Sequence, residues 1–110
     1  MTPAMTPMDA LAGRLAELIA LLEAADEHYW RRWMTRALAR IDDQQLAGVS
    51  QVLAAYGGQD TFSDLELSPE LEVQAPHRHQ ARNARLTELR TEIYELANTV
   101  TSGVAGSQDG

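Results

Sequence analysis

Ala55-Tyr56-Gly57-Gly58-Gln59-Asp60-Thr61-Phe62-Ser63-Asp64-Leu65 separates the parts of the chain that have helical periodicity. It contains two adjacent glycines, two aromatic residues and two acids. Glycine readily takes the left-handed conformation that ends many helices. We therefore expect Gly57 to stop the preceding helix and Gly58 to continue the turn. Phe62 and Leu65 are predicted to anchor the following loop on the helices.

Three amphipathic helices are predicted before this segment, because apolar residues recur there at intervals of three and four. The first begins at Pro7, behind a threonine N-cap at Thr6. The second is predicted over about 26–41 and the third over about 44–56. Asp42-Asp43 is expected to end the second helix and to cap the third.

A fourth helix is predicted over about 83–101, after an irregular acidic loop at 59–82 that contains two prolines. We expect a flexible N-terminus at 1–6, a single helical domain at 7–102 and a disordered tail at 103–110. The predicted fold class is all-α. It is a small four-helix bundle with an irregular loop packed against it between the third and fourth helices.

Composition excludes several functional classes. The 110 residues contain no cysteine, which excludes disulfides and thiolate chemistry, and the net charge is -7. Residues 42–76 carry seven acids and no base, so we expect no nucleic-acid partner and predict protein partners that are basic. The longest apolar run, Leu18 to Leu22, is far shorter than the ~20 residues that span a bilayer. No membrane contact and a cytoplasmic location are predicted.

No familiar catalytic or cofactor motif is present. His77-Arg78-His79 lies in the predicted loop without a fixed carboxylate partner, which favours surface histidines over a metal site. Ser63-Asp64 lacks a nucleophile elbow, and Gly57-Gly58 lacks the lysine of a P-loop. We therefore predict no catalytic, cofactor-binding or metal-binding residues, and no enzyme.

The second helix carries two side-chain groups with open interpretations. Tyr29, Trp30 and Trp33 have helical spacing, which favours core packing over a ligand cage. The tryptophans are expected to be the largest core side chains. An arginine recurs every four residues, at Arg32, Arg36 and Arg40. This pattern is typical of a solvated face. The alternative is docking onto an acidic surface, either the chain's own 59–72 segment or a partner.

Arg90 lies beside the apolar stripe of the fourth helix, with Tyr94 one turn on. An arginine at the edge of a core requires an acceptor for its hydrogen bonds, and we predict Asp64 for that role. The predicted site, a binding or structural motif, comprises Tyr56, Gly57, Gly58, Phe62, Asp64, Arg90 and Tyr94.

Four motifs occur together: Trp33-x-x-x-Ala37-Leu38, Ala55-Tyr56-Gly57-Gly58, Phe62-x-Asp64-Leu65 and Arg85-Leu86-x-x-Leu89-Arg90-x-x-Ile93-Tyr94-x-Leu96-Ala97. In these the chain resembles a family of small bacterial domains of unknown function, over about residues 12–100. The family pattern has an asparagine where this chain has Ser63, and its last motif begins Asn-x-x-Leu. The resemblance implies the fold and no established activity.

The favoured function is a non-enzymatic protein-binding or accessory protein, with an immunity-like role as one form. The first alternative is a small-molecule-binding protein with a pocket near Tyr56, Asp64 and Arg90. The second is a structural homodimer that associates through Leu21 and neighbouring apolar surface. A deep pocket at Asp64 and Arg90 would favour a small molecule, whereas Phe62 filling that space would favour the other two.

Overall fold

The computed structural model describes residues 6–57 and 61–108, with side chains as far as Gly103. Gly58 and nearly all of the predicted flexible 1–6 segment lie outside the described residues. The elements are α1 (Pro7–Ala24), α2 (His28–Asp42), α3 (Leu46–Ala54), η1 (Phe62–Asp64), α4 (Leu71–Gln74) and α5 (Pro76–Gln108). These described residues contain no strand, so the all-α class is confirmed. Within this same part of the chain, no helix combines the length and the apolar character needed to cross a membrane.

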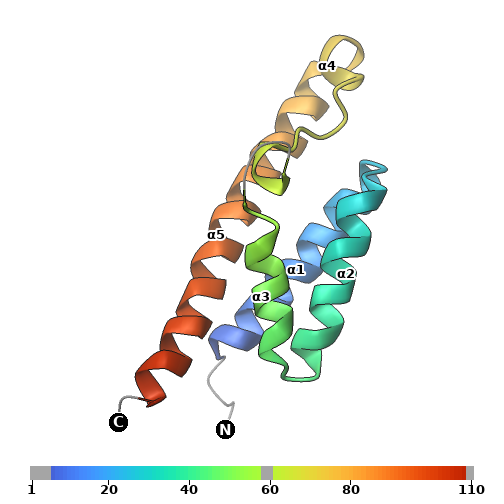
Figure 1. Ribbon diagram of the computed structural model, residues 1–110. Helices are drawn as coiled ribbons and strands as arrows, with labels where there is room; N and C mark the ends of the chain where they lie inside the picture. The colour runs from blue at the N-terminus through green and yellow to red at the C-terminus, as the bar shows by residue number, and fades with distance from the viewer. Residues whose placement is uncertain (1–5, 58–60, 109–110) are drawn as a thin grey trace, which may run out of the picture.

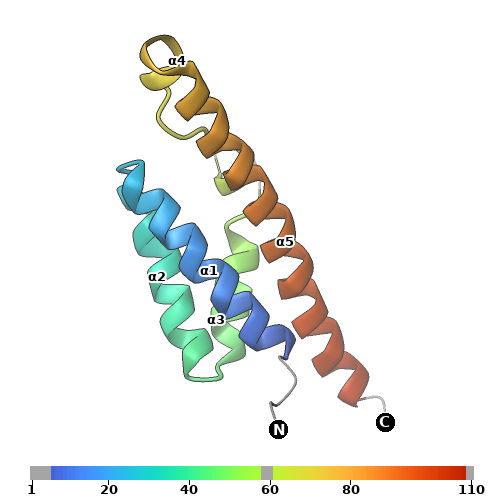
Figure 2. The ribbon, with the colours of Figure 1, turned by 180° about the vertical axis from the view of Figure 1, so that it is seen from behind.

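The four longer helices pack together (Figure 1). Helix α1 packs against α2 and α5, and α3 packs against the same two helices. The view from behind shows α1 running between α2 and α5 (Figure 2). Helix α5 projects beyond the other long helices at one end, and α4 lies against this projecting part. In the connection between α3 and α5, α4 thus packs on α5.

The core follows the predicted apolar stripes. Its fully buried leucines on α1 are Leu11, Leu15, Leu18 and Leu22. Helix α5 contributes Leu86, Leu89, Ile93 and Ala97. Outside the helical stripes, Phe62 is completely buried and is the largest of the fully buried side chains. One short 3-10 turn therefore supplies the bulkiest piece of the interior.

The prediction that the tryptophans are the largest core side chains is wrong, because Trp30 and Trp33 are only half-buried. The indole N–H of Trp33 donates to the Gln51 carbonyl at 2.9 Å, and the Gln51 amide donates to the Trp33 carbonyl at 3.2 Å. These two hydrogen bonds hold the half-buried Trp33 ring between α2 and α3.

Gly48 brings α2 and α3 into close contact. A Cβ atom added there would lie 2.7 Å from the Ala37 carbonyl oxygen and 2.9 Å from Cγ1 of Ile41. These separations are too short for any side chain larger than hydrogen. The periodicity of the sequence did not single out this glycine.

The ends of α3 differ from their prediction. Asp42 is the last residue of α2, and the N-cap of α3 is Gln45, without a side-chain capping bond. Gly57 does not take the predicted left-handed conformation. Helix α3 ends at Ala54, and the Phe62 N–H donates to the Ala55 carbonyl at 3.1 Å. A returning backbone group thus satisfies a carbonyl that the helix end leaves open.

The predicted irregular loop at 59–82 is helical at Leu71–Gln74 and again from Pro76. Helix α5 begins seven residues before the predicted start at 83, because proline suits the first helical position and needs no N–H partner there. The backbone of α5 continues to Gln108, whereas a disordered tail was predicted from 103. The isolated Gly103 does not stop it.

Candidate functional site

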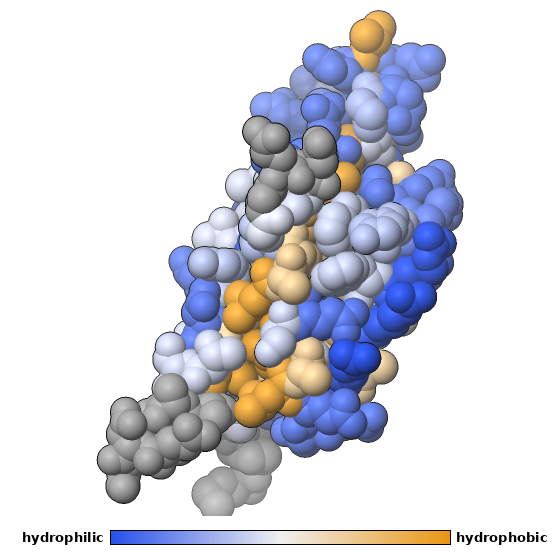
Figure 3. Space-filling view, in the orientation of Figure 1, coloured by the Kyte–Doolittle hydropathy of each residue, from blue (hydrophilic) through white to orange (hydrophobic). Residues whose placement is uncertain are grey.

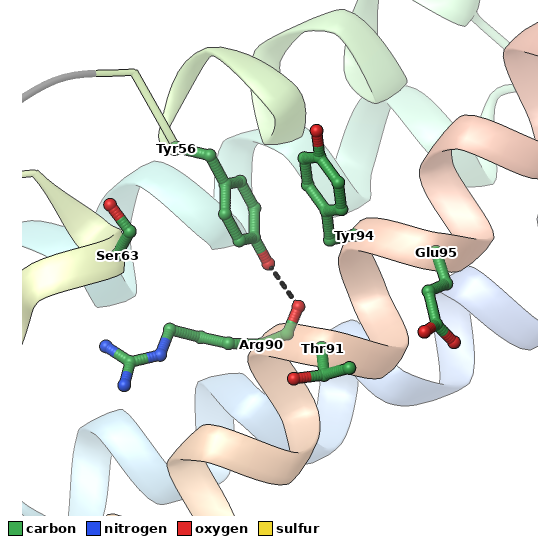
Figure 4. Close-up of a pocket in the computed structure, with 6 residues that line it drawn as sticks. All are labelled: Tyr56, Ser63, Arg90, Thr91, Tyr94 and Glu95. Carbon is green, nitrogen blue, oxygen red and sulfur yellow. Dashed lines mark hydrogen bonds between the residues drawn. The ribbon is translucent and has the colours of Figure 1, made fainter.

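Arg90 joins α5 to the segment that follows α3. Its Nη1 donates to the Phe62 carbonyl at 3.0 Å and to the Leu65 carbonyl at 3.1 Å. The Arg90 carbonyl in turn accepts the Tyr56 hydroxyl at 2.8 Å, as Figure 4 shows. We call these contacts of Tyr56, Phe62, Leu65 and Arg90 the aromatic clamp. The structure thus gives Arg90 backbone acceptors on either side of Asp64, and an ion pair with Asp64 stays a prediction.

The two tryptophans, three tyrosines and one phenylalanine of the chain lie in one connected group. The ring-centroid distances are 4.8 Å for Tyr29–Trp30, 5.5 Å for Trp30–Trp33, 5.6 Å for Trp30–Phe62, 5.5 Å for Phe62–Tyr56 and 5.1 Å for Tyr56–Tyr94. The two ends are exposed, Tyr29 by 56% and Tyr94 by 46%. The rings therefore pack on one another and leave an aromatic surface at each end.

Burial raises the pKa of the Tyr56 phenol; the Arg90 charge acts in the opposite direction, and Tyr94 raises it further. The phenol therefore stays protonated near neutral pH and remains a hydrogen-bond donor to the Arg90 carbonyl. A phenol in this state is poorly suited to act as a general base.

An open hollow of about 390 Å³ lies beside the aromatic clamp. It is lined by Tyr56, Ser63, Arg90, Thr91, Tyr94 and Glu95 (Figure 4). Phe62 lies in the core rather than in the lining. The structure thus brings together four residues of the predicted site, namely Tyr56, Phe62, Arg90 and Tyr94. Gly57 is exposed after α3, and Asp64 is exposed and absent from the lining.

A second group of contacts holds the connection nearer its end, and sequence reasoning missed it. The Asn83 oxygen accepts the Leu67 N–H at 2.7 Å, and its amide donates to the Leu67 carbonyl at 3.0 Å and to the His79 carbonyl at 2.8 Å. Arg82 donates to the hydroxyl of Ser68, which is buried at a φ of 49°. We call these contacts the polar clamp.

His79 has a carboxylate partner that the sequence did not reveal. Its Nε2 lies 2.9 Å from a carboxylate oxygen of Glu66, just before the polar clamp. His77, by contrast, is exposed. The two histidines of the His77-Arg78-His79 motif are therefore in different environments.

The arginines of α2 remain on the surface. Arg32, Arg36 and Arg40 are exposed and form no ion pair with another described residue. Figure 3 shows a strongly hydrophilic surface along α2 and hydrophobic side chains between the lower halves of α3 and α5. Within residues 61–72, the predicted internal docking of this arginine face is not found.

The fold and clamps define a small all-helical domain whose last connection is tied to a long C-terminal helix. Residues 14–72 match the family described as Domain of unknown function (DUF6966), and the chain belongs to this family. The predicted kinship with a domain family of unknown function is thereby confirmed. The match ends before α5, so the motif details on that helix stay predictions. No curated protein and no solved structure matches the chain.

Proposed function

We propose that this domain is a non-enzymatic protein-binding or accessory protein that takes a basic segment of a partner in the hollow between α3 and α5. The observation that carries this proposal is the exposed Tyr94 ring beside the exposed carboxylate of Glu95. In this arrangement the longer helices form a four-helix bundle. The segment packed against it contributes Ser63, from η1, to the lining of the hollow. An immunity-like role, binding and neutralising a partner, is one form of this function.

The chemistry of the hollow suits an arginine or lysine side chain. A cation within about 6 Å of a tyrosine ring is attracted by its face, and a carboxylate adds a charge-assisted hydrogen bond. Among the described residues Glu95 forms no ion pair, whereas Glu92 is paired with Arg14 at 2.8 Å. Arg90 is already bound to two carbonyls, so it leaves the Glu95 charge for a partner.

The shape of the hollow supports a protein over a small molecule. Small-molecule sites enclose most of their ligand, whereas this hollow is open and Phe62 fills the interior next to it. The protonated Tyr56 also supports binding over proton-transfer chemistry. Leu21, the predicted contact of a homodimer, is half-buried and packs against the core, which gives that alternative less support.

The test begins with the full chain as bait in a lysate of the native host, followed by binding measurements with the purified captured protein. Tyr94→Ala should weaken binding about tenfold or more, as expected for an aromatic side chain at the centre of an interface. Glu95→Gln should weaken it and reduce its salt dependence. Tyr29→Ala, at the other exposed end of the aromatic group, is the matched control and should leave affinity within about twofold of wild type.

Three results would contradict the proposal. The captured proteins could bind equally well after Tyr94→Ala, the control Tyr29→Ala could weaken binding as much, or the bait could capture no specific partner. Circular dichroism of each variant checks that helix content is unchanged.

A further inference from the structure

We propose that Glu66, Glu72 and His79 form a binding site for a divalent transition-metal ion, best matched by Zn²⁺. The three side chains come from the linker after η1, from α4 and from the first turn of α5. One ligand atom from each lies within 4.8 Å of the other two. The site is at the end where α5 projects beyond the other long helices (Figure 1), apart from the hollow at Tyr94.

The spacing suits a shared ion. Ligand atoms about 2.0–2.2 Å from one Zn²⁺ lie roughly 3–3.5 Å apart when they occupy neighbouring positions. His79 Nε2 and a Glu66 oxygen, 2.9 Å apart, are already close to such a pair. Glu72 is exposed, so a rotamer change can bring its carboxylate the remaining distance.

A hydrogen bond between His79 and Glu66 does not account for Glu72. The Glu72 side chain makes no hydrogen bond or ion pair within the described part of the chain. Its carboxylate nevertheless lies within 4.8 Å of ligand atoms of both other residues. Two carboxylates this close repel each other, and a divalent cation between them removes that repulsion.

The backbone that carries these ligands is held in place. The polar clamp binds Leu67, which adjoins Glu66, and the His79 carbonyl through the same Asn83 side chain. The Glu72 N–H donates to the Pro69 carbonyl at 3.1 Å, and the His79 N–H donates to the Ala75 carbonyl at 3.0 Å. Preorganised backbone lowers the conformational cost of metal binding. Asn83 is therefore a positioning residue for this site.

The donor set identifies the class of ion. An imidazole nitrogen with two carboxylates suits Zn²⁺ and related transition metals, whereas Ca²⁺ and Mg²⁺ prefer all-oxygen sites. Three protein ligands leave a position for water or a partner's side chain. Because the chain has no cysteine, thiolates do not compete for the ion.

The experiment titrates Zn²⁺ into the full chain without a histidine tag, by calorimetry, with Co²⁺ absorption as a second readout. Wild type should bind one ion per chain. Glu72→Gln and His79→Gln should each weaken binding about tenfold or more. Each has a matched control that retains the cluster, Glu70→Gln and His77→Gln, which should bind within about twofold of wild type.

Zn²⁺ should also raise the melting temperature of wild type and both controls, but not that of the ligand variants. If His79→Gln unfolds, Glu72→Gln still tests the proposal, because the Glu72 carboxylate makes no bond that the fold requires. Absence of binding to wild type overturns the proposal. So does a Glu72→Gln variant that binds as wild type does, or an equal loss in the controls.

Discussion

Arg90 and Asn83 both tie the α3–α5 connection to α5, but they act among different side chains. Each side chain binds backbone groups of this connection. Arg90 lies next to the fully buried Phe62 ring, and the guanidinium carbon of Arg90 is 6.0 Å from the ring centroid. Asn83 lies near the start of α5, and the polar clamp there holds the fully buried Leu67 and the buried polar Ser68. Both clamps combine a buried apolar side chain with hydrogen bonds; the first adds contacts between aromatic rings, and the second adds the Arg82–Ser68 hydrogen bond.

Phe62→Ala should have the largest effect, because it removes the bulkiest fully buried side chain. Emptying a phenylalanine site typically lowers the free energy of unfolding by about 3–5 kcal/mol. Urea denaturation followed by circular dichroism measures the loss. Val73→Ala is the control on the same connection, since Val73 is 89% exposed and should change little. A loss below about 1 kcal/mol at Phe62 would show that the aromatic clamp does not depend on its ring.

Asn83→Ala should lower the free energy of unfolding by about 2–3 kcal/mol, because it leaves three hydrogen bonds without their side-chain partner. Asn98→Ala on the same helix is a matched control, since Asn98 makes one local bond, to the Tyr94 carbonyl. The same urea experiment compares them. Equal losses in the two variants would remove the distinction between the polar clamp and an ordinary surface asparagine.

The difference between the clamps also explains what the sequence could predict. Apolar spacing identified the stripes of α1 and α5, and Phe62 and Leu65 were rightly expected to anchor the connection. The positions of such side chains can be predicted from their spacing, because burial is their main contribution to stability. Arg90 was recognised as needing an acceptor, since a cation at a core edge demands one. Its acceptors are backbone carbonyls, however, which no residue type encodes.

Asn83 could not be assigned in the same way, because an asparagine in a helix is usually a surface residue and its partner Leu67 lies 16 residues away. The prediction for the start of α5 was wrong for a related reason. Pro76 can break a helix or begin one, and the local sequence is compatible with both roles. Gly48 was missed because periodicity gives the face of a helix and not the distance to its neighbour.

Gly48 near the start of α3 and Gly57 after its end offer a second comparison, because packing requires a glycine only at Gly48. Gly48→Ala should destabilise by about 1–3 kcal/mol, because its Cβ would lie 2.7 Å from a backbone oxygen of α2. Gly57→Ala should be neutral or stabilise by up to about 1 kcal/mol, because its Cβ would be 3.7 Å from the nearest atom and no left-handed conformation is needed. Thermal melts show whether each substitution raises or lowers the melting temperature. A large loss at Gly57 would restore the predicted helix-stop role.

Tyr56→Phe should cause a small destabilisation at neutral pH, about 1 kcal/mol, because it removes one hydrogen bond to the Arg90 carbonyl. Tyr94→Phe is the matched control, as the Tyr94 hydroxyl makes no hydrogen bond within the described residues. Urea denaturation at pH 7 compares the two.

The pH dependence separates this hydrogen bond from a simple change in packing. Burial raises the pKa of Tyr56 in the folded protein above its unfolded value near 10, so the folded state holds this proton more tightly. The resulting stability is fully present below about pH 10 and is lost as the pH rises from there towards the folded pKa. Wild type and Tyr94→Phe should therefore lose stability more steeply than Tyr56→Phe above pH 10. Parallel curves for all three proteins would mean that the aromatic clamp does not hold the phenol in its protonated form.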